Sequence, residues 1–231
     1  MRTEEITFIA GAATRPAFLA LPESRTPAPG IVVIHEAFGL NENIREVSRR
    51  FAEIGYAALA VDLFAGRNRA VCMFRLMAGV VGGSLERYGM VELRAALDHL
   101  ANRSEVDPHR LGSIGFCMGG SFAIAWACTD PRLKVIAPFY GANPRPVEAV
   151  ARLCPVVGSY PGKDFTTGHG RKLDTILAAH GVRHDIKVYE GAKHSFFNDR
   201  GGNHDAAAAA DAWARVTAFF AEQLTVGGAP V

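Results

Sequence analysis

The stretch at 114–120, Ile-Gly-Phe-Cys-Met-Gly-Gly, constrains the fold of this chain more than any other segment. It ends an apolar run at 111–116 that predicts a buried strand, and an alanine-rich run at 121–128 that predicts a helix follows it. A strand that turns directly into a helix places its corner residue, here Cys117, in a strained backbone conformation. The glycines two positions before and after this corner fit a G-x-nucleophile-x-G turn, where any side chain would collide with the turn.

A single cysteine in an intracellular protein is more often a small buried hydrophobe than a reactive group. A packing cysteine, however, has no need of Gly115 and Gly119 on either side. The predicted corner also lies at a helix N-terminus, where unpaired N–H groups favour a thiolate and an oxyanion. We therefore expect Cys117 to be a nucleophile.

The bulk properties indicate one globular domain over residues 1–231. The chain is 49% hydrophobic, and its 25 Lys and Arg against 23 Asp and Glu give a net charge of +2 with no dense basic run. This nearly balanced, scattered charge argues against nucleic acid and membrane partners and favours a small-molecule substrate. The protein is expected to be a monomer or a homodimer. No apolar stretch resembles a signal peptide or is long enough to span a bilayer, so a cytoplasmic location is expected. The four cysteines lack metal-ligand spacing and are expected to be free thiols that bind no metal: Cys72, Cys117, Cys128 and Cys154.

Strands and helices are predicted to alternate along the chain, which indicates an α/β fold with a mostly parallel central sheet of about eight strands and helices on both faces. The expected strands lie near 6–8, 17–21, 31–34, 57–61, 111–116, 135–137, 156–158 and 184–189, the first two as an antiparallel hairpin at a sheet edge. The expected helices cover 43–54, 84–102, 121–128, 173–180 and 205–224. The irregular segment 63–83 predicts a loop with a short helix over the site, and 226–231 a flexible tail.

The carboxyl ends of the predicted strands carry the polar residues, and ligands bind at that end of an open α/β sheet. His35 and Glu36 follow one strand. They begin like a zinc-binding H-E-x-x-H, but the second histidine position holds Gly39, so this interpretation fails. Glu36 is either a solvated loop charge or a carboxylate that faces the nucleophile.

Asp164 follows a later strand and His194 follows the last one. Nucleophile, acid and histidine in this order are typical of α/β-hydrolases. The thiolate of Cys117 would attack an acyl carbon, the imidazole of His194 would exchange the proton, and the carboxylate of Asp164 would fix the imidazole tautomer.

The sequence resembles the dienelactone hydrolase family of the α/β-hydrolases. Four stretches carry this resemblance: 33–41 (VIHEAFGLN), 115–120 (GFCMGG), 160–164 (YPGKD) and 194–198 (HSFFN). The resemblance implies a Cys117, His194 and Asp164 triad, with a Glu36 that bonds the resting thiol and helps to form the thiolate when substrate arrives.

The resemblance also implies a function and a set of binding residues. The main-chain N–H groups of Ala37 and Met118 would form the oxyanion hole. The reaction would open the lactone ring of a dienelactone to give maleylacetate, a step of aromatic degradation. It would use no metal and no organic cofactor, and arginines would hold the substrate carboxylate. The candidate substrate-binding residues are Phe38, Arg69, Arg75, Tyr140, Phe196 and Asn198, and Arg67 is a further arginine of the same segment. Asn198 stands where the family pattern suggests an arginine, which weakens the case for the dienelactone itself.

Two alternatives remain open at this point. One is a broad-specificity carboxylesterase or thioesterase, and the other is a catalytically idle α/β-hydrolase domain that binds a small molecule.

Overall fold

The computed structural model describes residues 1–24, 26–64 and 68–225. The expected tail at 226–231 and Arg67 lie outside these residues. The described chain forms an eight-stranded sheet in the order β1-β2-β4-β3-β5-β6-β7-β8. The strands are β1 (Arg2–Ala10), β2 (Ala13–Leu21), β3 (Ala28–Ile34), β4 (Ala57–Val61), β5 (Val106–Phe116), β6 (Leu133–Phe139), β7 (Val156–Lys163) and β8 (His184–Lys193).

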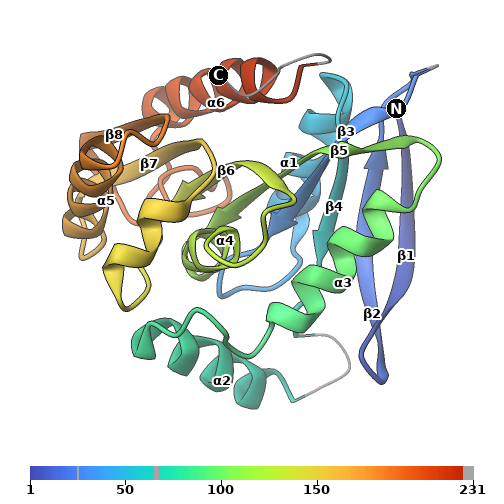
Figure 1. The fold of residues 1–231 in the computed structure, drawn as a ribbon, viewed down its shortest axis with the longest axis horizontal. Helices are drawn as coiled ribbons and strands as arrows, with labels where there is room; N and C mark the ends of the chain where they lie inside the picture. The colour runs from blue at the N-terminus through green and yellow to red at the C-terminus, as the bar shows by residue number, and fades with distance from the viewer. Residues whose placement is uncertain (25, 65–67, 226–231) are drawn as a thin grey trace.

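The six strands from β4 to β8 in this order run parallel to one another, whereas β1 and β2 are antiparallel. The first two strands form the expected hairpin at the sheet edge, closed between Ala10 and Ala13. Since parallel strands end at the same edge, the loops that follow β3, β5, β7 and β8 lie along one side of the sheet (Figure 1). The expected α/β sheet is confirmed.

Helices cover both faces of the sheet (Figure 1). The apolar sides of α1 and α6 pack in one core, and α2, α3, α4 and α5 contribute to the other. The helices are α1 (Glu42–Glu53), α2 (Arg69–Gly82), α3 (Met90–Ala101), α4 (Met118–Ala127), α5 (Thr167–Ala179) and α6 (Ala206–Gln223), with a 3-10 turn η1 (Val147–Arg152). The central strands β3 and β4 are therefore buried on both faces, which explains their fully apolar sequences, whereas the edge strand β8 remains largely exposed and polar.

Three helices differ from the prediction. Helix α5 begins at Thr167 rather than at residue 173, because its first two turns hold glycines and polar residues and show no apolar pattern. Helix α2 has 14 residues, where a loop with only a short helix was expected. Cys72 and Leu76 on one side of α2 are buried, whereas the apolar Phe74 is exposed. Because apolar residues stand on both sides of the helix, the sequence shows no clear helical pattern. Helix α3 begins at Met90 rather than near residue 84, because Gly89 before it has a φ of 101° and cannot continue a helix backward.

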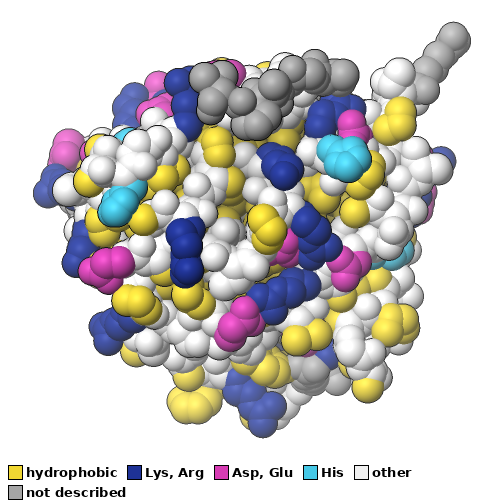
Figure 2. Space-filling view, in the orientation of Figure 1, with side chains coloured by type: hydrophobic (Ala, Val, Ile, Leu, Met, Phe, Trp, Pro, Cys, Tyr) yellow, Lys and Arg dark blue, Asp and Glu magenta, His cyan; other side chains and the backbone are white. Residues whose placement is uncertain are grey.

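The surface carries charges of both signs. In Figure 2 the Lys and Arg side chains are interspersed with Asp and Glu over the face in view and do not gather in one basic patch. Within the described ranges, no helix has the length and apolar character that crossing a membrane requires.

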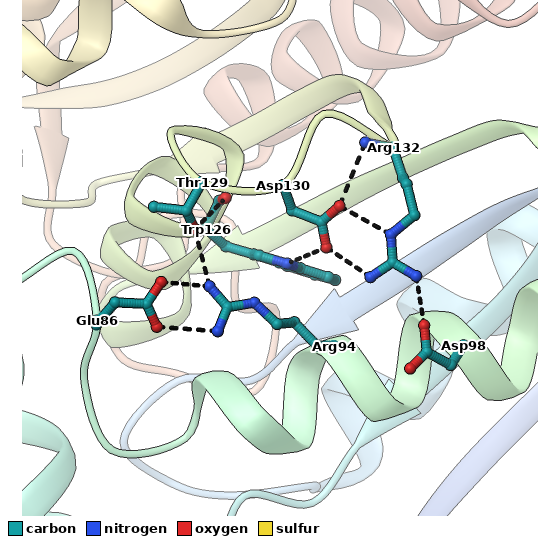
Figure 3. Close-up of polar contacts among 7 residues, drawn as sticks. All are labelled: Glu86, Arg94, Asp98, Trp126, Thr129, Asp130 and Arg132. Carbon is teal, nitrogen blue, oxygen red and sulfur yellow. Dashed lines mark hydrogen bonds and ion pairs between the residues drawn. The ribbon is translucent and has the colours of Figure 1, made fainter.

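A cluster of ion pairs lies at the C-terminal end of α4, the helix that begins at the predicted nucleophile (Figure 3). Asp130 is only 5% exposed. Its carboxylate accepts hydrogen bonds from Trp126 Nε1 at 3.0 Å and from Arg132 Nε at 2.8 Å and Nη2 at 2.7 Å. Arg132 also pairs with Asp98 on α3, so the cluster joins α4 to the neighbouring helix.

We expect Asp130→Asn to lower the free energy of unfolding by about 2 kcal/mol, because hydrogen bonds to a charged group are lost from a buried site. Burial alone would raise the pKa of Asp130, but hydrogen bonds from Arg132 and Trp126 outweigh it and hold the pKa below the ordinary value of 3.8. The carboxylate therefore contributes stability above that pH and loses the contribution as the pH falls through the lowered pKa. Urea unfolding at several pH values measures the difference, which should shrink in acid. The exposed Asp98→Asn is the matched control and should cost less than about 0.5 kcal/mol; equal losses would contradict this role for Asp130.

Candidate active site

Cys117 occupies the expected corner between β5 and α4. Its backbone has φ 55° and ψ −114°, a conformation that a residue with a side chain adopts only under strain. A Cβ atom on Gly115 would lie 2.1 Å from the carbonyl oxygen of Gly119, and one on Gly119 would lie 2.3 Å from the carbonyl oxygen of Ile34. Both contacts are with main-chain atoms, which cannot move aside. Glycine is therefore required at both positions, as the sequence pattern predicts.

The thiol of Cys117 is partly exposed and lies in a negative environment. Burial and then the charge of Glu36 raise its pKa to about 11, with a smaller contribution from Asp164. Hydrogen bonding from the main-chain N–H groups of Met118 and Ala37 acts in the opposite direction. Two points follow: the resting thiol is protonated at neutral pH, and the two expected oxyanion donors face the sulfur.

His194 and Asp164 are paired as expected. The distance from His194 Nδ1 to Asp164 Oδ2 is 2.8 Å, and Thr166 donates to the same carboxylate oxygen through both its hydroxyl and its main-chain N–H. Burial would raise the pKa of Asp164, but the hydrogen bonds from His194 and Thr166 outweigh it and lower the pKa. Because an ionised carboxylate only accepts, Nδ1 carries the proton and Nε2 of the neutral ring is a proton acceptor.

Nε2 of His194 is buried and makes no hydrogen bond with any described residue, the Cys117 thiol included. The imidazole and the thiol thus lie at the same edge of the sheet without being joined. Hydrogen bonds between catalytic groups are often long in structures without substrate and tighten when it binds.

Glu36 is 2% exposed and is held by three neutral donors. Tyr140 Oη donates to Oε1 at 3.0 Å, Ser195 Oγ to Oε1 at 2.9 Å, and Asn198 Nδ2 to Oε2 at 3.2 Å. The hydrogen bond to the resting Cys117 thiol that the resemblance implies is absent between these two described residues. A buried carboxylate needs several donors, and the loops after β6 and β8 supply them. Glu36 therefore acts on the thiol through its charge in this structure.

His35 holds the loop that carries Glu36 and Ala37. The ring is fully buried, its Nε2 accepts a hydrogen bond from the main-chain N–H of Leu63 at 3.0 Å, and its Nδ1 lies 2.6 Å from the carbonyl oxygen of Glu36. Since Nε2 accepts, Nδ1 must donate. Burial lowers the pKa of His35, so the ring is neutral at pH 7 and ties this loop to the end of β4.

Backbone strain is concentrated at this site. In the described part of the chain, three residues other than glycine have positive φ: Cys117 at 55°, Tyr140 at 40° and Ser195 at 62°. One is the predicted nucleophile and the other two donate to Glu36. Residues in such conformations persist where the surrounding structure fixes them, and they cluster at functional sites.

The structure separates the candidate substrate-binding residues into two groups. Phe38 is 59% exposed, and Arg69 donates a hydrogen bond to its carbonyl oxygen and lies over the ring of Phe64. Both side chains are accessible, and Phe38 follows the expected oxyanion donor Ala37 in the chain. Arg75 is exposed on α2, with its guanidinium 5.6 Å from the ring centre of Tyr88.

The other three candidates point into the protein. Phe196 is fully buried and its ring packs against Tyr140 and Tyr189 in the core. Tyr140 is buried with its hydroxyl on Glu36, and the side chain of Asn198 donates to Glu36 and accepts from the main-chain N–H of Arg200. All three side chains are buried and therefore offer no surface that substrate can reach in this structure.

Three residues support this site but were not predicted from the sequence to do so. They are His35, which anchors the loop, Ser195, which donates to Glu36, and Phe165, whose ring stacks on His194. Ser195 and Phe165 stand next to His194 and Asp164 in the chain, but adjacency gave no indication of where their side chains point. Among the described residues, no group of three or more His, Cys, Asp or Glu is arranged to hold a metal ion.

Comparison with known proteins places this chain in a family. Residues 16–224 match the model of the dienelactone hydrolase family. A predicted carboxymethylenebutenolidase of Saccharolobus solfataricus is 34% identical, over 94% of this chain and 97% of that protein. A predicted carboxymethylenebutenolidase of Escherichia coli K12 is 32% identical, over 89% of this chain and 81% of that protein.

Solved structures agree with this assignment. The crystal structure of a predicted dienelactone hydrolase from Klebsiella pneumoniae superposes with a TM-score of 0.83 at 28% identity, covering 96% of this chain and 98% of that one. A dienelactone hydrolase-like promiscuous phosphotriesterase from metagenomic libraries gives a TM-score of 0.85 at 26% identity, covering 97% and 99%. The chain belongs to the dienelactone hydrolase family and is a hydrolase of lactones or esters.

Proposed function

We propose that the protein hydrolyses a small lactone or carboxylic ester through a Cys117, His194 and Asp164 triad and a covalent acyl-enzyme. One observation carries the proposal: the Asp164 carboxylate fixes His194 with Nε2 free to take a proton, at the sheet edge where Cys117 stands strained below two main-chain N–H groups. A thiol nucleophile, a proton carrier and oxyanion donors are the groups that acyl transfer needs.

The reaction proceeds in two stages. In the first, the thiol proton passes to Nε2 of His194, the thiolate forms a C–S bond with the carbonyl carbon, and the N–H groups of Ala37 and Met118 hold the oxyanion. The C–O bond then breaks and His194 gives its proton to the departing oxygen. In the second, His194 takes a proton from water, the hydroxide attacks the thioester, and the C–S bond breaks to release the carboxylic acid. The proton on His194 then returns to the sulfur and restores the resting thiol.

Glu36 controls the ionisation of Cys117 in this scheme. Its negative charge raises the pKa of the thiol and so keeps the resting enzyme protonated. The arriving carbonyl places its oxygen at the N–H groups of Ala37 and Met118, and the thiol proton then passes to Nε2 of His194, directly or through the Glu36 carboxylate. A resting thiol protects the enzyme from reaction with other electrophiles.

The substrate class is tested by comparing an anionic enol-lactone of the dienelactone type with neutral p-nitrophenyl acetate. Lactone turnover by the wild-type protein supports the proposal. The exposed Arg69, which donates to the carbonyl oxygen of Phe38, is the proposed cation for a substrate carboxylate. Fast p-nitrophenyl acetate turnover without lactone turnover would favour a broad carboxylesterase or thioesterase. Stoichiometric alkylation of Cys117 without hydrolysis of any lactone or ester would favour a binding domain.

Glu36→Gln should separate the two effects of this carboxylate. We expect the turnover of an active lactone or ester to fall by about 100-fold, because a group that takes part in proton transfer typically contributes that much or more. The rate of Cys117 alkylation by iodoacetamide at pH 8 should rise, because removal of the neighbouring charge lowers the pKa of the thiol from about 11. Initial-rate kinetics and mass spectrometry of the alkylated peptide measure the two rates.

The exposed Glu53 at the end of α1 provides a matched control, since Glu53→Gln changes the net charge equally. It should alter neither rate by more than about twofold. Unchanged turnover in Glu36→Gln would remove Glu36 from the mechanism.

A further inference from the structure

Phe165 lies directly against the histidine of the site. It follows Asp164 in the chain, and its ring centre is 5.2 Å from that of His194 with the two planes 19° apart. The ring of Tyr140 contacts the same imidazole with a centre distance of 5.0 Å and an angle of 56°. Tyr140 is buried, but Phe165 is 74% exposed. An open apolar surface therefore stands beside the group that exchanges the proton.

The chemistry of acyl transfer determines which part of a substrate this surface meets. His194 gives its proton to the departing oxygen, so that oxygen must come within hydrogen-bond reach of Nε2. The leaving group then lies along the imidazole on which Phe165 is stacked. The acyl carbonyl oxygen lies instead at the main-chain N–H groups of Ala37 and Met118, next to Phe38.

We propose that Phe165 forms the binding wall for the leaving group and selects substrates whose departing oxygen is attached to a flat apolar group, an aryl or conjugated enol rather than an alkyl alcohol. Aromatic rings favour offset-stacked partners, and an exposed ring that is already held parallel to His194 extends a flat surface toward such a group. Phe165 takes no part in proton transfer and no bond to it forms or breaks. The inference rests on the proposed function, because it uses His194 as the proton donor to the leaving group.

Phenyl acetate and trifluoroethyl acetate test this assignment, since they differ in the leaving group but share the acetyl group and hence the same acyl-enzyme. For Phe165→Ala we expect kcat/KM to fall about tenfold or more with phenyl acetate, the discrimination typical of a lost apolar contact, and to change by less than about twofold with trifluoroethyl acetate. Phe165→Tyr keeps the ring and should retain most of the wild-type rate with both esters. Phe74 on α2 is also 74% exposed but makes no ring contact with His194, so Phe74→Ala is the matched control and should leave both rates unchanged.

The pH dependence of kcat/KM with trifluoroethyl acetate shows whether His194 itself is disturbed, and it should be the same in wild type and Phe165→Ala. An equal loss with both esters would mean that Phe165 acts by positioning His194, and no loss with either would mean that the ring does not meet the leaving group. Both results would overturn the inference while the hydrolase function stands. If the wild-type protein hydrolyses neither ester and no lactone, the proposed function is wrong and the inference fails with it.

Discussion

Replacement of Cys117 by alanine should abolish turnover, with kcat/KM falling by roughly 10⁴-fold or more toward the background rate. The reason is chemical: the C–S bond of the acyl-enzyme cannot form, and no other described thiol stands at a strained strand-to-helix turn below two main-chain donors. The fold should be retained, because alanine removes a single sulfur atom from a partly exposed position. Steady-state kinetics on an ester or lactone that the wild-type protein hydrolyses measures the loss.

Cys128 offers a matched control for this substitution. Burial raises the pKa of its thiol to about 11 as well, but it lies at the end of α4 opposite to Cys117. Cys128→Ala should keep turnover within about twofold, apart from a small loss of stability. Retained turnover in Cys117→Ala would mean that the turn had been misinterpreted.

The second large effect is expected for Asp164→Asn, which should lower kcat/KM by roughly 10³- to 10⁴-fold. The amide of asparagine can donate to Nδ1 of His194, which would move the ring proton to Nε2 and remove the acceptor that the mechanism needs. Because the pKa of Asp164 is lowered, its carboxylate is ionised throughout the neutral range, and the loss should be the same at every pH above about 5. Kinetics across that range measure it.

A second Asp and His pair on the surface serves as the control for Asp164→Asn. Asp174 Oδ1 lies 3.3 Å from His184 Nε2, and Asp174 is exposed. Asp174→Asn breaks a pair of the same chemistry away from the sheet edge that carries the site, so turnover should be unchanged. If Asp164→Asn also kept full activity, His194 would not depend on the carboxylate and the triad would be incorrect.

The parts of this molecule that the sequence predicts well are those set by local patterns. The buried strand β4 was predicted with its observed bounds, and the turn at Cys117 was recognised because two glycines are sterically required within five residues. The chain order of Cys117, Asp164 and His194 also predicted that the three residues lie at one edge of the sheet. Each of them follows a parallel strand, and the carboxyl ends of these strands lie at the same edge.

The directions of individual side chains could not be predicted in this way. Phe196 stands beside the site residues in the chain, yet its ring turns into the core, whereas Phe165 remains exposed and stacks on His194. The three donors that hold Glu36 come from loops more than a hundred residues away in the chain, and a backbone with positive φ at Tyr140 and Ser195 aims two of them. Such rotamers and strained turns depend on long-range packing, for which periodicity and composition provide no signal.

The most direct measurement of the central claim is mass spectrometry of the protein quenched in acid during turnover of a slowly deacylated aryl ester. The account predicts a mass increase equal to the acyl group, located on the peptide that contains Cys117, and its absence in Cys117→Ala. Turnover without any acyl adduct on Cys117, or an adduct on another residue that decays at the rate of turnover, would contradict it.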